Sequence, residues 1–81
     1  MSRYTTADAA GRMVAYGYDH ACGYDHACGY FIQVFKDDEP VIDLDSRFDG
    51  LTGVRLAQEL VILQAEIPSV HHERMLMDLT F

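Results

Sequence analysis

The side chains best suited to chemistry lie in a hexapeptide that occurs twice in succession, Gly-Tyr-Asp-His-Ala-Cys at 17–22 and again at 23–28. Imidazole and thiolate are preferred ligands of Zn²⁺, and two of each complete a tetrahedral set. In an extended strand the histidine and the cysteine of one copy share a face, so each copy can supply a pair of ligands. The candidate metal ligands are His20, Cys22, His26 and Cys28.

The spacing of these ligands differs from that of structural zinc modules. Such modules combine Cys-x₂₋₄-Cys with His-x₃₋₅-His, whereas this chain repeats His-x-Cys after six residues. The four side chains meet only if the two copies form opposite arms of a hairpin. Otherwise the repeat is a duplicated loop that lengthens a hairpin connection and binds nothing. Zinc binding is therefore an alternative hypothesis, and the main interpretation includes no cofactor.

The same residues do not predict an enzyme. A Cys–His nucleophile needs a base within hydrogen-bond distance and donors that stabilise an oxyanion. His20 and Cys22 can lie close together, but an exact repeat would place two equivalent nucleophiles in a surface loop. No helix is expected after Gly17, Gly23 or Gly29, so these glycines do not form a phosphate-binding loop. We expect a protein without catalytic activity.

Two further groups of side chains have structural interpretations. His71 and His72 are adjacent at the start of a predicted helix, and adjacent helical residues point about 100° apart, so they cannot chelate one ion well. We expect both on the surface. Tyrosines that follow the predicted strands and the repeat are either interface anchors or part of the core, and both interpretations stay open. They are Tyr16, Tyr18, Tyr24 and Tyr30.

Composition predicts one small domain that covers residues 1–81. Apolar residues make up 49% of the chain, which is enough for a core and argues against disorder. The net charge is −7, from 13 acidic and 6 scattered basic residues, so nucleic acid is not an expected partner. The apolar run 60–63 is too short to span a membrane, and the polar residues 1–6 do not open a signal segment. A cytoplasmic protein is expected.

Alternation of apolar side chains predicts three strands, at 13–18, 30–35 and 41–45. The strand at 30–35 is apolar on both faces, so we expect it to be central and covered on both sides. The segment 1–11 is expected to be frayed, or to form one helical turn capped by Thr6.

Apolar side chains at helical spacing predict a helix over 54–67, capped by Thr52 and stopped by Pro68. Ser69 is expected to cap a second, short helix. The predicted fold is α+β: a three-stranded antiparallel meander followed by two helices packed on the sheet.

The long helix carries more apolar surface than a small sheet can cover, because residues 61–63 are consecutive apolar residues. We therefore expect an interaction module that pairs with a second copy as a homodimer, or that also binds a larger protein. Zinc binding through the repeat is the first alternative. A second alternative is an acidic decoy protein from a mobile element, whose acids between 37 and 49 imitate a nucleic-acid backbone.

Overall fold

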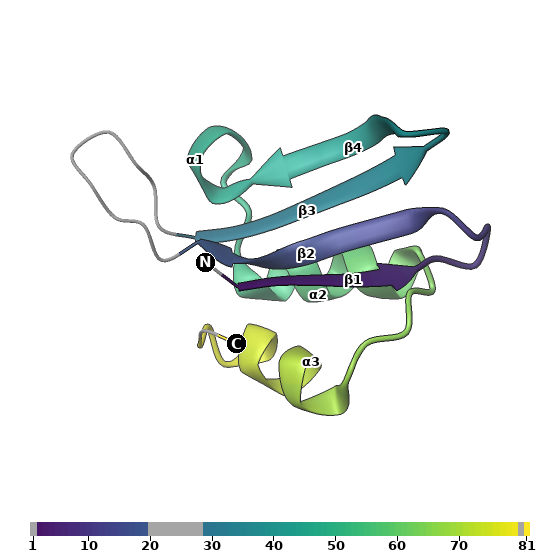
Figure 1. Cartoon of the computed structure of the whole chain (residues 1–81). Coiled ribbons are helices and arrows are strands. Elements are labelled where there is room, and N and C mark those ends of the chain that lie inside the picture. Colours follow the sequence, from purple (N-terminus) through teal and green to yellow (C-terminus); the bar gives the residue numbers. More distant parts are fainter. Residues whose placement is uncertain (1, 20–28, 80) are drawn as a thin grey trace.

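The computed structural model describes residues 2–19, 29–79 and 81 (Figure 1). Four strands form one antiparallel sheet in which each strand pairs with the next along the chain. The helices follow the strands in sequence, and Figure 1 shows α2 lying across one face of the sheet with α3 beside it. The strands are β1 (Ser2–Ala7), β2 (Met13–Asp19), β3 (Gly29–Lys36) and β4 (Glu39–Asp45). The helices are α1 (Ser46–Asp49), α2 (Gly53–Ile62) and α3 (Ser69–Leu76).

The prediction of a three-stranded sheet was wrong, because β1 is a fourth strand. Residues 2–7 are neither frayed nor helical: they pair with β2 in a register that places Tyr4 opposite Tyr16. Side chains of β1 alternate between half-buried and exposed, with Tyr4 against the core. As an edge strand with one solvent-exposed face, β1 can be largely polar and still pair, which hides it from a search for apolar alternation. The α+β class stands.

The turn between β1 and β2 is built around the buried carboxylate of Asp8. Its Oδ1 accepts hydrogen bonds from the backbone N–H groups of Ala10 at 3.0 Å and Arg12 at 2.8 Å, and its Oδ2 accepts one from Arg12 Nε at 2.7 Å. Burial alone would raise the pKa of Asp8, but these hydrogen bonds and the Arg12 charge hold it below its usual value. The Ala9 N–H donates to the Leu63 carbonyl oxygen at 3.1 Å, which joins this turn to the end of α2.

The second and third hairpins bring β3 into the centre of the sheet. Asp19 pairs with Gly29 at the end of the β2–β3 hairpin that adjoins the connection between the two strands. Asp37 and Asp38 form the two-residue turn to β4 with φ values of 52° and 64°, as a type I′ turn requires. On β4, Ile42 and Leu44 pack against the core.

The prediction that β3 is covered on both faces was also wrong. Its side chains alternate strictly: those facing the helices are buried, and those on the opposite face are only half-buried. Phe31, Gln33 and Phe35 lie on this opposite face, and in the described part of the chain both long helices pack on the other one. Within residues 2–19, 29–79 and 81, no second layer covers the aromatic rings of this open face.

Helix α2 begins as predicted and ends early. The Thr52 side chain accepts a hydrogen bond from the Arg55 N–H at 3.1 Å, which confirms it as the N-cap. The helix ends at Ile62 instead of running to 67, because Gln64 adopts a left-handed conformation with φ 55°. The N–H groups of Gln64 and Ala65 then donate to carbonyl oxygens of the last turn, forming a Schellman motif.

Helix α3 begins one residue earlier than predicted. Pro68, not Ser69, occupies the N-cap position, and no side chain caps this helix. Asp78 ends the following turn with φ 58°. The core lies between the sheet and both long helices. It consists of Val14, Tyr16, Tyr30, Ile32, Val34, Leu51, Leu56, Ala57, Leu60 and Met75.

Candidate functional site

The predicted metal ligands lie outside the described residues. His20, Cys22, His26 and Cys28 all fall within 20–28, between the described parts of β2 and β3. Among the residues that the structure does describe, no group of three or more His, Cys, Asp or Glu side chains is placed to hold a metal ion. Zinc binding by the repeat thus stays a prediction.

Helix α2 is apolar on two sides, as the sequence predicts. One side faces the sheet and is fully buried, with Leu56 and Leu60 at its centre. The other side exposes Val54 to 46%, Val61 to 63% and Ile62 to 73%. Isolated exposed apolar side chains are ordinary on protein surfaces, but a continuous group of them on one helix marks an interaction site. The second apolar side of α2 is therefore the leading candidate site.

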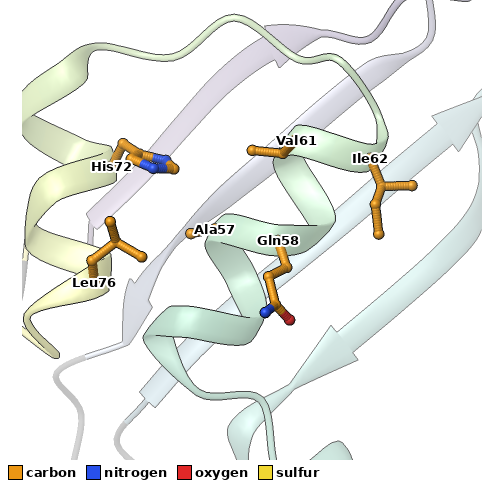
Figure 2. A pocket seen from close by; sticks show the side chains of 6 residues that line it. All are labelled: Ala57, Gln58, Val61, Ile62, His72 and Leu76. Atoms are coloured by element: carbon orange, nitrogen blue, oxygen red, sulfur yellow. The ribbon is translucent and has the colours of Figure 1, made fainter.

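This exposed side of α2 meets α3 in a shallow apolar groove of about 330 Å³, shown in Figure 2. No Asp, Glu, Lys or Arg side chain lines the groove. The only polar residues that line it are Gln58 and His72, and the atoms that face it are almost all apolar. We call the groove residues together with Val54 the α2–α3 surface. Its members are Val54, Ala57, Gln58, Val61, Ile62, His72 and Leu76.

The close contact that fixes α3 against α2 depends on a glycine. A Cβ atom at Gly53 would come within van der Waals overlap of the Met75 carbonyl oxygen and would approach Tyr30 Cζ at 3.0 Å. Only a residue without a side chain lets the start of α2 approach the end of α3 this closely. Met75, which is fully buried, packs into the core at the same point. Gly53 thus allows the close approach of the first turn of α2 to the last turn of α3.

The orientation of α3 is set by His71, which is not the surface side chain that we predicted. Its Nδ1 lies 2.8 Å from Tyr16 Oη, and its ring centroid lies 4.2 Å from that of Tyr4. Phe81 packs against the same rings. Burial lowers the pKa of His71 and the Arg74 charge lowers it further, while burial raises the pKa of Tyr16 to about 12.

The two adjacent histidines therefore serve different surfaces. His71 turns inward to the aromatic cluster, and His72 lines the groove with Leu76. Their divergence follows from the angle between neighbouring helical residues. Packing His71 inward places His72 and Leu76 on the groove side of α3.

The tyrosines of the sheet belong to the core. Tyr16 and Tyr30 are buried, and Tyr18 packs edge-on against Tyr30 with ring centroids 5.0 Å apart. The Tyr30 hydroxyl donates to Asp78 Oδ1 at 3.1 Å. Burial, together with Asp78, raises the pKa of Tyr30 to about 12. These rings stabilise the domain and are not free to anchor a partner, while Tyr24 lies outside the described residues.

Sequence reasoning missed the open face of the sheet. Met13 is exposed there, Phe31 and Phe35 are half-buried, and the Arg3 guanidinium lies 5.9 Å from the centre of the Phe31 ring. The unbroken apolar run of β3 was the available signal, but it was interpreted as a strand covered on both faces. This face mixes apolar and charged side chains, unlike the uniformly neutral α2–α3 surface.

No described helix combines the length and the apolar character needed to cross a bilayer. Comparison with known proteins gives no match: no family model, no curated protein sequence and no solved structure is significantly similar to this chain.

Proposed function

We propose that this protein is a non-enzymatic interaction module that pairs with a second copy of itself through the α2–α3 surface. The observation that supports the proposal is the exposed apolar side of α2, where Val61 and Ile62 lie beside a groove floored by Ala57. Removing apolar surface from water stabilises a complex by about 25 cal/mol per Å². Pairing of two copies would bury this apolar surface.

The size of the surface requires both helices. A stable interface buries about 800 Å² on each partner, which is roughly a sixth of the 5151 Å² accessible surface of this chain. Helix α2 has 10 residues and is only about 15 Å long. Leu76 and the exposed Met77 extend the apolar area beyond it. A dimer interface of standard size therefore has to use α2 and α3 together.

Charge favours a second copy as the occupant. The chain carries a net charge of −7, so two copies repel each other wherever their acids meet. The α2–α3 surface has no carboxylate, and two copies can approach there without bringing acids together. A strongly basic partner could form no ion pairs with the residues of this surface. The Arg55–Glu59 ion pair, at 3.3 Å, joins the first and last turns of α2 outside the groove.

A pair of matched substitutions tests the proposal. Val61→Glu places a carboxylate on the α2–α3 surface, whereas Val41→Glu makes the same change on β4 at a site of similar exposure, 50% against 63%. Glutamate is a better helix former than valine, so Val61→Glu should not weaken α2. Burying its charge at an interface costs several kcal/mol.

The masses of both variants and the unmodified protein are measured by size-exclusion chromatography with light scattering. The unmodified chain and Val41→Glu should give twice 9.2 kDa at high micromolar concentration. Val61→Glu should be monomeric, with an unchanged circular dichroism spectrum. A dimer that survives Val61→Glu would rule out this surface.

A further inference from the structure

We propose that the two copies pair through antiparallel α2 helices, with the two Gln58 side chains facing each other across a two-fold axis. The inference rests on the proposed self-association and adds its geometry. Three observations support it: the spacing of the exposed residues of α2, the chemistry of the Gln58 amide and the difference in size between the two ends of the row.

The exposed row of α2 is centred on Gln58. Val54, Gln58 and Ile62 follow each other at intervals of four residues, so they form one row along the helix. Figure 2 shows the Gln58 side chain on α2 between Ala57 and Ile62, with its amide directed away from His72 and Leu76 of α3. A two-fold axis through Gln58 makes the helices antiparallel and puts Val54 of each copy opposite Ile62 of the other.

The Gln58 amide is complementary to a second copy of itself. It has an acceptor oxygen and an NH₂ donor, so two amides related by a two-fold axis can each donate to the other. The Gln58 side chain makes no hydrogen bond to any residue that the structure describes. Gln58 is exposed in the single chain and its neighbours in the row are apolar, so an interface that covered the row would bury the amide, which would then need a partner. The partner that an isologous dimer supplies at its axis is the same amide.

An antiparallel pair also matches the sizes of the side chains at the two ends of the row. Val54 is smaller than Ile62, so placing each against the other gives both ends of the contact the same width. A parallel pair would set valine against valine and isoleucine against isoleucine, and would leave the helices further apart at one end. Antiparallel helix dipoles attract each other, whereas parallel ones repel.

Disulfide mapping tests the geometry. The background variant is Cys22→Ser with Cys28→Ser, which removes the native thiols, and single cysteines are then introduced by Gln58→Cys, Val54→Cys or Ile62→Cys. A disulfide requires Cα atoms within about 7 Å. In the antiparallel pair, the two copies of position 58 meet at the axis. The two copies of position 54 lie about 12 Å apart along the helices, because each is four residues from the axis.

Under mild oxidation Gln58→Cys should cross-link with itself. Val54→Cys and Ile62→Cys should cross-link efficiently only when the two are mixed. Self-cross-linking of both Val54→Cys and Ile62→Cys, without the mixed product, would overturn the antiparallel geometry in favour of a parallel pair. Cross-linking at none of the three positions in a protein that light scattering shows to be dimeric would place the interface elsewhere.

The role of the amide has its own test in two further variants. Gln58→Glu sets two carboxylates face to face at the axis and should weaken the dimer by about tenfold or more. Gln58→Leu, of similar length and uncharged, should retain a dimer. Equal dissociation constants for these two variants would show that position 58 does not lie at the axis. If the background variant is monomeric at every concentration, the proposed function fails, and the geometry fails with it.

Discussion

Deleting one copy of the repeated hexapeptide, residues 23–28, should leave the fold intact and make it more stable. The pairs Tyr18–Tyr30 and Asp19–Gly29 close the β2–β3 hairpin, so the connection between them is the nine residues 20–28. The deletion shortens this connection to three residues, which is a common length for a hairpin loop. Because the two copies are identical, deleting either of them gives the same sequence.

The expected gain follows from the entropy of loop closure. This cost grows as the logarithm of loop length, and shortening the loop from nine residues to three reduces it by about 1 kcal/mol. In a domain of this size, 1 kcal/mol raises the melting temperature by about 4–8 °C. The strand pairs and the Tyr18–Tyr30 ring contact at 5.0 Å are kept, because both tyrosines remain in the shortened chain.

Urea and thermal unfolding, followed by circular dichroism, measure this gain. A control variant replaces residues 23–28 with six glycine and serine residues, which keeps the loop length and removes the side chains. Its free energy of unfolding should stay within about 0.5 kcal/mol of the unmodified protein. A deletion variant that is less stable by 1 kcal/mol or more would refute the reasoning, because it would mean that the second copy contributes contacts to the domain.

Three other predictions concern the end of α2, the inward-facing His71 and the repeat. Gln64→Gly should raise the free energy of unfolding by about 0.5–1 kcal/mol, because residue 64 has φ 55°; Asp78→Gly, at φ 58°, should gain less because it removes a hydrogen-bond acceptor. Burial and the neighbouring arginine lower the pKa of His71. The unfolded chain therefore binds the proton more readily, so stability should be complete above about pH 6.5 and fall below it. Urea midpoints between pH 7.5 and 5.5 should fall less steeply in His71→Gln, and equal slopes would contradict this. Elemental analysis of protein purified without a metal-affinity tag should find about one Zn²⁺ per chain if the repeat binds zinc. Zinc retained by Cys22→Ser with Cys28→Ser would exclude those ligands.

Elements whose apolar side chains recur at regular spacing in the chain could be predicted from the sequence. Strands β2, β3 and β4 and the start of α2 were predicted because their apolar periodicity and the Thr52 cap are local signals. Strand β1 could not be predicted in this way, because its pairing depends on the contact with Tyr16 of β2 and on the turn that Asp8 stabilises. The early end of α2 depends on a left-handed Gln64, a conformation that glutamine seldom adopts.

The candidate site was predictable only in part. Three consecutive apolar residues, 61–63, are enough to indicate a helix that is apolar on two sides. The groove could not be predicted from local sequence patterns, because it depends on the position of α3 relative to α2. That position is set by the approach of Gly53 to Met75 and by the contact of His71 with Tyr16. Nothing in the residue types of α3 alone shows which of its two histidines turns inward.

Sedimentation equilibrium of the unmodified chain over a range of concentrations tests the central claim most directly. The average mass should rise from 9.2 kDa towards twice that value. Added salt should strengthen the association, because it screens the repulsion between two chains of charge −7 while leaving the neutral interface unchanged. A mass that stays at 9.2 kDa up to about 1 mM would contradict pairing through the α2–α3 surface.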